Sequence, residues 1–414
     1  MTDRVDPLLF KGIPLEAESA LGEIGSRGWN VARGDTATPA ATLSSTALES
    51  NAEEMARFCA VHGVSLAPHA KTTLAADLLQ VQARHGAWAM TVALPRQAAL
   101  VWEQGFARIL LANEVTDVSA VRSLVARRDA AADRELLVYA DSGRGVDLLK
   151  RAVTGVVRPL DVLVELGQQG GRTGCRSLEE AVAVARLVDA APQLHLAGVA
   201  GYEGTIASTR DVDSFAAVNG YLGRLRLLAQ TLVRERLIDP EGSVVTAGGS
   251  IFFDAVVDQL GGWCADSGSR LVLRSGCYLI HDHGIYATGT PARHGVVDAP
   301  RLVPALSVWA RVVSHPEDGL ALLDAGRRDL SHDAGLPVPL ERWRDGEPLS
   351  LTDTRVTALS DQHAFMTWSG ELDLVEGDLV RLGISHPCTT LDRWRLLFLV
   401  DDSYGVHGAV TTAF

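Results

Sequence analysis

Cysteine is scarce in this sequence, and its few residues are not arranged in pairs. The chain of 414 residues contains five cysteines, and none of them forms a Cys-x-x-Cys motif. An odd, scattered set argues against a disulfide framework and against a structural zinc finger. We therefore expect a protein of the reducing cytoplasm.

Long apolar runs and basic clusters are also missing. No segment offers the roughly 18 consecutive apolar residues that a membrane-spanning helix needs, and residues 1–30 lack the basic start and apolar centre of a secretory signal. The formal net charge is -13 and the pI is about 5.4. An acidic chain without a basic run is not suited to nucleic acid or to an anionic membrane surface, so neither is expected as a partner.

What the sequence does contain is a regular alternation of short apolar runs and longer helical segments over residues 40–296. The apolar runs lack polar alternation and are followed by segments of helical periodicity, a pattern typical of a parallel sheet. Eight or nine such units favour a (β/α)₈ barrel of the TIM type over an open doubly wound sheet. The runs are Val64–Ala67, Ala87–Val92, Ile109–Ala112, Leu136–Ala140, Val162–Leu166, Leu194–Ala200, Val244–Ala247 and Leu271–Leu273.

The pattern changes near residue 297. From there to residue 414, short β-type runs separated by turns predict a second, mostly antiparallel β domain. We expect residues 1–39 to form an N-terminal extension that packs on this domain. The predicted fold class is therefore α/β, with a (β/α)₈ barrel over residues 40–296 followed by an antiparallel β domain over residues 297–414.

Lys71 ends the first apolar run, in Pro68-His69-Ala70-Lys71-Thr72, just before an amphipathic stretch. Barrel enzymes place their sites at the carboxyl ends of the strands. A lysine at such a turn can be held partly desolvated in a cleft, as the lysine that bonds to pyridoxal phosphate is. Taken alone, Lys71 is better explained as an exposed lysine on a turn, since most lysines are solvated.

Two glycine-rich turns offer backbone donors for a phosphate group. Gly248, Gly249 and Ser250 follow one apolar run and precede a helical segment, and Arg274-Ser275-Gly276-Cys277-Tyr278 follows the next run. Small residues let N–H groups approach an anion, and a following helix adds its positive dipole end. Each turn alone is ordinary loop geometry, but barrels commonly bind phosphate after their last strands.

Arg172 lies in the glycine-rich segment Gly167–Gly174, after another predicted strand. Arginine stays cationic, so it can donate a hydrogen bond to a pyridine nitrogen without readily protonating it. Pyridoxal phosphate bound in this way would be a weak electron sink. An ion pair between Arg172 and Glu165, or with surface acids, is equally consistent with the sequence.

His386 and Cys388 are the main candidates for metal ligands. They are two residues apart, so on an extended segment both side chains point the same way, and imidazole with thiolate suits Zn²⁺. Two protein ligands leave positions open for water or substrate. A buried cysteine beside an unrelated histidine is the commoner meaning of a His-x-Cys motif. His281 and His283 are a competing pair, and His363 is a candidate ligand, supporting group, acid/base or plain loop histidine.

Taken together, these motifs resemble those of the fold-type III D-serine dehydratase and D-threonine aldolase family and, more distantly, the barrel of alanine racemase. The resemblance extends from about residue 40 to residue 410, and the motifs occur in the family's order. It rests on Pro68-His69-Ala70-Lys71-Thr72, Thr91-Val92-Ala93, Leu110-Leu111-Ala112-Asn113-Glu114, Arg172-Thr173-Gly174, Gly248-Gly249-Ser250 and His386-Pro387-Cys388.

The resemblance implies a role for each residue of the barrel site. Lys71 would be the lysine bonded to pyridoxal phosphate, and Arg172 the partner of the ring nitrogen, with Arg274 as the alternative. Tyr202 would lie near the cofactor. The phosphate and the cofactor edge would be bound by Gly248, Gly249, Ser250, Gly276 and Tyr278.

The resemblance also implies a metal and a second subunit. His386 and Cys388 would hold a divalent metal, for which the thiolate favours zinc over manganese. Proteins of this family are homodimers whose sites combine the barrel of one subunit with the β domain of another, so a homodimer is implied.

These roles imply a metal-dependent dehydratase, an amino acid deaminase that eliminates the β-hydroxyl of a D-β-hydroxy amino acid such as D-serine to give a 2-oxo acid and ammonia. Lys71 would remove the Cα proton, with His363 as a further acid/base candidate. The alternative is D-threonine aldolase-type retro-aldol cleavage to glycine and an aldehyde. A non-catalytic protein that binds pyridoxal phosphate is the alternative of another class, and the long β domain counts against it.

Two departures from the family bear on the substrate. D-Threonine aldolases tend to carry a carboxylate where this chain has Cys388, which favours the dehydratase branch. Tyr202-Glu203-Gly204 lacks the Tyr-x-His arrangement of many relatives. The choice among D-serine, D-threonine and D-threo-3-hydroxyaspartate therefore stays open.

Overall fold

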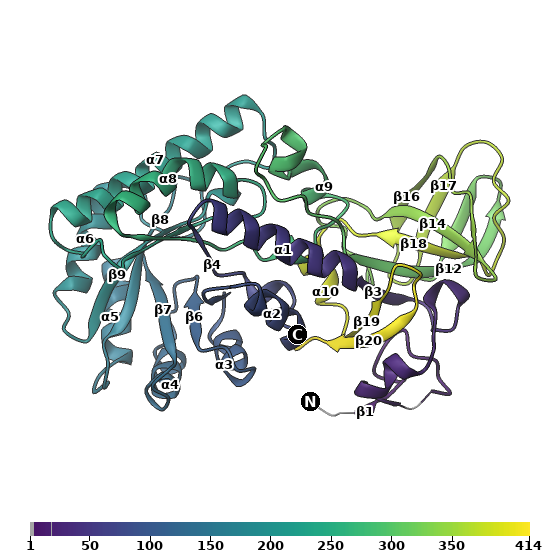
Figure 1. Ribbon diagram of the computed structural model, residues 1–414, viewed down its shortest axis with the longest axis horizontal. Helices are drawn as coiled ribbons and strands as arrows, with labels where there is room; N and C mark the ends of the chain where they lie inside the picture. Colours follow the sequence, from purple (N-terminus) through teal and green to yellow (C-terminus); the bar gives the residue numbers. More distant parts are fainter. Residues whose placement is uncertain (1–3, 18) are drawn as a thin grey trace.

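The computed structural model describes residues 4–17 and 19–414, which form two lobes (Figure 1). One lobe is built on an eight-stranded sheet and the other on a ten-stranded sheet. Figure 1 shows them side by side along the long axis, with α1 (Ser45–Val61) and α10 (Pro387–Leu391) near the junction. Within the described ranges, no helix combines the length and apolar character needed to cross a bilayer.

The first lobe is a parallel barrel whose strands follow the predicted apolar runs. The strand order is β4-β11-β10-β9-β8-β7-β6-β5, with neighbours parallel throughout. A parallel bridge from His69, just after β4, to Thr91 of β5 joins the two ends of this order. The predicted (β/α)₈ barrel is thereby confirmed. Its strands are β4 (Ser65–Leu66), β5 (Met90–Val92), β6 (Arg108–Leu111), β7 (Glu135–Ala140), β8 (Leu160–Leu166), β9 (Leu194–Gly201), β10 (Val244–Ala247) and β11 (Arg270–Leu273).

Helices follow the strands and cover the outside of the barrel. Several begin at side-chain caps: Ser44 accepts a hydrogen bond from the Ala47 amide at the start of α1, and Asp117 and Ser177 cap α4 and α6. Such caps satisfy amides that have no partner in the first helical turn. The helices after α1 are α2 (Ala76–Arg84), α3 (Pro95–Glu103), α4 (Val118–Asp129), α5 (Gly143–Ala152), α6 (Leu178–Asp189), α7 (Val212–Arg234), α8 (Phe253–Ser267) and α9 (Ile285–Gly289).

Side chains alternate along each strand between the helices and the barrel interior. The interior is filled by an apolar set that includes Ala67, Leu110, Leu137, Leu163, Ala200 and Val272. Towards the carboxyl ends of the strands the inward positions become polar, with Tyr139, Glu165 and Arg274 each two residues beyond an apolar inward residue. The barrel therefore carries a polar layer at the end where barrel sites form.

The second lobe is the predicted β domain, and its sheet is antiparallel apart from one pair. The strand order is β15-β14-β18-β12-β13-β17-β16, and β3 (Ala40–Ser44) pairs antiparallel with β12 and parallel with β19. An antiparallel β domain after the barrel is confirmed. The remaining strands are β12 (Leu306–Glu317), β13 (Leu320–Leu323), β14 (Val338–Arg344), β15 (Glu347–Leu349), β16 (Thr354–Leu359), β17 (Ala364–Trp368), β18 (Leu379–Gly383), β19 (Leu396–Val400) and β20 (Val406–Thr411).

The N-terminal residues lie on this second lobe. Strands β1 (Arg4–Val5) and β2 (Ser19–Ala20) pair antiparallel. Ile13 and Ile24 are buried in one cluster with Trp309 and Phe398 of the β domain. Lys11 adds an ion pair with Asp329 at 2.7 Å. The chain thus reaches the centre of the second sheet at β3 before it enters the barrel.

Candidate active site

Lys71 lies on η3 (Ala70–Thr72), the short 3-10 turn that follows β4. Its side chain is exposed, whereas Ala70 and Thr72 on either side are buried. The turn is fixed by close packing against the end of β11, because a Cβ atom on Gly276 would lie 2.6 Å from the carbonyl oxygen of His69. A side chain there would push the turn away, so Gly276 supports the backbone that presents Lys71.

Three cationic side chains gather around His69. Burial lowers the pKa of His69 well below its ordinary value, and the positive charges of Lys71, Arg274 and Arg172 lower it further. The guanidinium carbon of Arg172 lies 4.7 Å from the ring centre of Tyr202, a cation–π contact. The structure therefore brings together four of the residues that the sequence singled out: Lys71, Arg172, Tyr202 and Arg274.

The two arginines differ in how far they are already engaged. Arg274 is 6% exposed, and its two terminal nitrogens donate to Thr246 Oγ1 at 2.7 Å and to the carbonyl oxygen of Gly201 at 2.5 Å. Arg172 is exposed. Its loop is held instead by Arg176, whose guanidinium donates to four carbonyl oxygens of the loop, those of Gly171, Arg172, Thr173 and Gly174. Arg172 therefore has the more accessible guanidinium, and both arginines stay candidates for the ring nitrogen.

The predicted phosphate turn already holds a carboxylate. Glu203, the first residue of η4 (Glu203–Thr205), is fully buried, and its Oε2 and Oε1 atoms accept hydrogen bonds from the Gly248 and Gly249 amides at 2.9 and 2.6 Å. A phosphate at these two donors would face the charge of Glu203. The two amides are thus already engaged by Glu203, and their predicted role as phosphate donors stays a prediction. Ser250, which is half-buried, is the accessible residue of this turn.

Tyr278 is another residue that the structure places differently. It lies on η5 (Cys277–Leu279) and is 1% exposed, within the core between the barrel and its helices. Its hydroxyl hydrogen-bonds with Gln82 of α2, and burial raises its pKa. Tyr278 therefore supports the packing of η5, and its predicted place at the cofactor edge stays a prediction.

Among the residues that the structure describes, several buried polar atoms at the carboxyl end of the barrel have no hydrogen-bond partner: His69 Nδ1, Tyr139 Oη, Glu165 Oε2 and both carboxyl oxygens of Glu114. Burial, followed by the charge of Glu165, raises the pKa of Glu114 to about 9. Leaving a buried polar atom unpaired costs about 1–3 kcal/mol. This end of the barrel is therefore suited to a polar group, and pyridoxal phosphate fits an amine, two arginines and unsatisfied donors and acceptors.

Only a weak signal for this polar layer is present in the sequence. Tyr139, Glu165 and Arg274 are polar residues at inward positions of strands that are otherwise apolar inside. A polar residue that breaks the inward apolar pattern at a strand end could have marked them. Glu203 carried no such signal, since its partners Gly248 and Gly249 lie on the turn after a different strand, β10.

His386 and Cys388 lie at the start of α10 rather than on an extended segment. His386 is the residue before the helix and Pro387 its first residue. The two side chains nevertheless meet, and a hydrogen bond with Cys388 raises the pKa of His386 to about 9. The Nδ1 atom of His386 lies 2.6 Å from Asp333 Oδ2. With the Asp333 carboxylate at Nδ1, the Nε2 atom of His386 is left for a metal, so His386 and Cys388 together fit a divalent ion.

The metal candidates reach the barrel of their own chain. Cys388 Sγ lies 3.4 Å from Thr72 Oγ1 and 3.3 Å from Cys277 Sγ, and α10 packs on η3. Among the described residues, no three histidine, cysteine or carboxylate side chains are already grouped for a metal ion. In the competing pair, His281 Nδ1 accepts a hydrogen bond from the Asp282 amide, and the backbone amide of His283 donates to the Ile384 carbonyl. The role of this pair as metal ligands stays a prediction.

His363 lies on the exposed turn between β16 and β17. Its carbonyl oxygen accepts a hydrogen bond from the Ser360 amide at 2.8 Å. None of the contacts found in the described part of the chain joins its side chain to Lys71, His386 or Cys388. A single chain therefore does not bring His363 into the group around Lys71.

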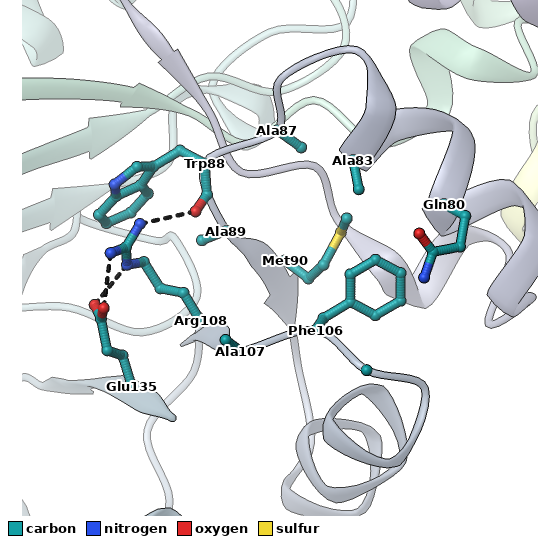
Figure 2. Close-up of a pocket in the computed structure, with 11 residues that line it drawn as sticks. Gln80, Ala83, Ala87, Trp88, Ala89, Met90, Phe106, Ala107, Arg108 and Glu135 are labelled. Carbon is teal, nitrogen blue, oxygen red and sulfur yellow. Dashed lines mark hydrogen bonds and ion pairs between the residues drawn. The ribbon is translucent and has the colours of Figure 1, made fainter. Parts of the chain in front are cut away.

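A cavity of about 280 Å³ lies at the opposite end of the barrel, where β5, β6 and β7 begin (Figure 2). Figure 2 shows Arg108 between Trp88 and Glu135. Its guanidinium donates to the Glu135 carboxylate at 2.7 Å, and its guanidinium carbon lies 4.6 Å from the ring centre of Trp88. The arginine is thus satisfied by its neighbours. Barrel sites form at the carboxyl ends of the strands, so this cavity is separate from the candidate active site.

The sequence matches the family model for the N-terminal domain of alanine racemase over residues 43–258 and the model for a putative serine dehydratase domain over residues 305–400. The chain belongs to the fold-type III family of pyridoxal-phosphate enzymes. The resemblance that the motifs predicted is confirmed.

Named members of this fold-type III family align along nearly the whole chain. D-threo-3-hydroxyaspartate dehydratase of Delftia sp. (strain HT23) is 26% identical over 376 residues, which cover 85% of this chain and 91% of that protein. The solved D-threonine aldolase from Filomicrobium marinum is 26% identical, with a TM-score of 0.79 over 93% of this chain and 97% of that one. A cysteine-to-alanine mutant of D-threo-3-hydroxyaspartate dehydratase, solved in the metal-free form, is 20% identical, with a TM-score of 0.72 over 91% and 97%.

Proposed function

We propose that this protein is a pyridoxal-phosphate- and metal-dependent dehydratase that removes the β-hydroxyl group of a D-β-hydroxy amino acid such as D-serine, giving a 2-oxo acid and ammonia. One observation carries the proposal: Cys388 of the β domain lies 3.4 Å from Thr72, the residue after Lys71. The candidate metal ligand and the candidate cofactor lysine therefore lie on adjoining turns.

Bound pyridoxal phosphate would supply an electron sink for the Cα–H bond of an amino acid, and a bound metal would supply a Lewis acid for a leaving oxygen. Lys71 offers the exposed amine, which would carry the cofactor and take the Cα proton at Nζ. Arg172 and Arg274 keep their charge at any physiological pH and would bind and orient anionic or acceptor groups beside that amine.

His386 and Cys388 would hold the metal, and zinc suits an imidazole with a thiolate. Asp333 fixes the orientation of the His386 ring through its Nδ1 atom. The relative with a cysteine replaced by alanine was solved in the metal-free form, which supports a cysteine as a ligand. A thiolate in place of a carboxylate also favours elimination over retro-aldol cleavage, as the resemblance implies.

Product analysis tests this proposal. The purified holoenzyme is incubated with D- and L-serine, D- and L-threonine and the four 3-hydroxyaspartate isomers, with and without added Zn²⁺ or Mn²⁺. We expect a 2-oxo acid and ammonia in equal amounts from a D-β-hydroxy amino acid, and loss of turnover after chelation. Turnover of the L-substrates alone, or a rate that chelation leaves unchanged, would contradict the proposal.

A retro-aldol reaction is the second candidate, and the similarity to D-threonine aldolase favours it. In that reaction a base takes the hydroxyl proton and the Cα–Cβ bond breaks. Glycine and an aldehyde, without ammonia, would identify it. A non-catalytic protein would instead bind pyridoxal phosphate and convert none of the substrates.

We also propose a cytoplasmic homodimer in which His363 acts on the site of the partner subunit. The exposed turn that carries His363 is free to meet a second chain. Inactive Lys71→Ala and His363→Ala proteins, unfolded and refolded together, should recover activity, because a mixed dimer would contain one site with both residues intact. Differently tagged chains show whether mixed dimers have formed. If mixed dimers form but activity does not recover, His363 does not act on the partner's site.

A further inference from the structure

Cys277 and Cys388 are two thiols from different lobes that meet beside Lys71. Cys277 follows barrel strand β11, whereas Cys388 lies on α10 of the β domain, and their Sγ atoms are 3.3 Å apart. Thr72 Oγ1 lies 3.6 Å from the first sulfur and 3.4 Å from the second. Both thiols are partly exposed, unlike the three cysteines buried in the barrel, Cys59, Cys175 and Cys264.

We infer that Cys277 is a second thiolate ligand of the metal that binds Cys388, so that the metal joins the barrel to the β domain. This inference rests on the proposed function for the presence of a metal at Cys388. It adds a ligand that neither the His-x-Cys motif nor the family resemblance contained.

The distance between the sulfurs supports a shared ion. Two thiolates on one tetrahedral zinc ion lie about 3.8 Å apart, given Zn–S bonds of about 2.3 Å. The observed separation of 3.3 Å needs only a small opening of the pair to reach this value. Two thiolates this close would repel each other, and a cation between them removes that repulsion.

The number of ligands supports it as well. Catalytic zinc sites commonly have three protein ligands and one open position for water or substrate. His386 and Cys388 supply two, and Cys277 would complete the set. Cys388 contacts both His386 and Cys277. In the described residues the three side chains are not yet grouped around one point. Shared binding requires side-chain rotations that bring all three ligands to one ion.

The test is cobalt binding to the holoenzyme, kept reduced and depleted of other metals. Co²⁺ bound by thiolates shows charge-transfer absorption whose intensity rises with the number of sulfur ligands. We expect Cys277→Ser and Cys388→Ser each to lower this absorption by about half and the affinity for Co²⁺ at least about tenfold. Cys59→Ser, the same change at a thiol buried in the core of the barrel lobe, should leave both within about twofold. Circular dichroism shows whether each variant is folded, and Cys277→Ala replaces Cys277→Ser if the latter is not.

Different results separate this inference from the proposed function. If Cys277→Ser keeps the wild-type absorption and affinity while Cys388→Ser loses them, the inference is wrong and the metal-dependent function stands. If the wild type binds no Co²⁺, both fail. If unreduced wild type loses two titratable thiols to a Cys277–Cys388 disulfide, while reduced wild type and Cys277→Ser bind Co²⁺ equally, the thiols are a redox pair and the inference is overturned.

Discussion

The Sγ atom of Cys388 lies 3.4 Å from the Oγ1 atom of Thr72, although 316 residues separate them in the chain. Thr72 belongs to the turn that carries Lys71, and Cys388 belongs to the short helix that packs on that turn. Lys71, the candidate cofactor lysine, and the candidate metal ligands are therefore fixed relative to each other by the contact between the two lobes. Changes on either side of this contact should affect the site, which the following predictions use.

Replacing Lys71 by alanine should abolish both turnover and the visible absorbance of the lysine-bound cofactor. The amine is the only group in this proposal that both bonds to the cofactor and takes the Cα proton, so we expect a loss in kcat of at least about 10³-fold. Absorbance spectra and product assays measure the two effects. Lys150→Ala, at a partly exposed lysine of α5 paired with Asp147, is the matched control and should change neither. A Lys71→Ala protein that keeps the absorbance and the turnover would refute the assignment.

Replacing Glu203 by glutamine should destabilise the fold. The buried carboxylate accepts hydrogen bonds from two consecutive glycine amides, whereas a carboxamide has one oxygen and would turn its NH₂ group toward the second amide. We expect the free energy of unfolding to fall by about 1–3 kcal/mol, the cost of an unsatisfied buried donor. Urea unfolding measures it, with the exposed Glu241→Gln as control. Equal midpoints for the two variants would mean that this carboxylate is dispensable.

Replacing Gly276 by alanine should displace the lysine turn. The new Cβ atom would lie 2.6 Å from the His69 carbonyl oxygen, and backbone atoms cannot give way as a flexible side chain can. We expect a loss of about 1–3 kcal/mol in stability together with a lower kcat. Gly220→Ala on α7 is the control, because its Cβ atom would meet open space and a helical alanine is more stable than glycine by about 1 kcal/mol. A Gly276→Ala enzyme with wild-type kcat would show that the turn adapts.

The contribution of Glu114 to stability should fall as the pH rises from about 4.5 to about 9. Burial and the charge of Glu165 raise the pKa of Glu114 from its usual value of 4.5 to about 9. The folded state therefore keeps a proton over a range in which the unfolded chain has lost it. Stability from this group is fully present below the unfolded pKa and is lost as the pH rises toward the folded one.

Glu114→Gln tests this pH dependence, because it keeps a neutral side chain at every pH. The free energy of unfolding of the holoenzyme is measured by urea titration between about pH 6 and pH 8. It should fall more steeply with pH for the wild type than for the variant, by up to about 1.4 kcal/mol per pH unit. The exposed Glu53→Gln should follow the wild type. Parallel curves for wild type and Glu114→Gln would show that Glu114 is ionised in the folded protein.

Local patterns were sufficient to predict the architecture. The barrel strands appear in the sequence as apolar runs such as Val162–Leu166, because both faces of each strand are covered, and the β domain appears as short runs between turns. The position of β3 could not be predicted in this way. It lies between β12 and β19, and the pairing of strands more than 260 residues apart leaves no mark on the local pattern.

The site was predictable where a residue's role depends on its place at a strand end. Lys71, Arg172, Tyr202 and Arg274 converge because each follows or ends a strand of one barrel. Roles that depend on packing between elements were missed or misplaced. A tyrosine after Gly276 looks the same whether it faces the site or the core, and Tyr278 faces the core.

The contact between distant segments was also beyond the sequence. Pro387 could have indicated that the His386–Cys388 segment begins a helix, since proline favours the first helical position. No pattern, however, relates Cys277 to Cys388 or Glu203 to the glycine turn. Each of these pairs depends on how separate elements approach one another in the folded chain.

The place of β3 between β12 and β19 also sets an order of events during synthesis. A ribosome releases residues 40–44 long before residues 306 and 396, so this strand must wait without its sheet partners while the barrel is made. Such high contact order slows folding and exposes an unpaired strand edge, for which chaperones have affinity. Because Cys388 lies just before β19, the candidate active site is among the last parts of the molecule to assemble on a nascent chain.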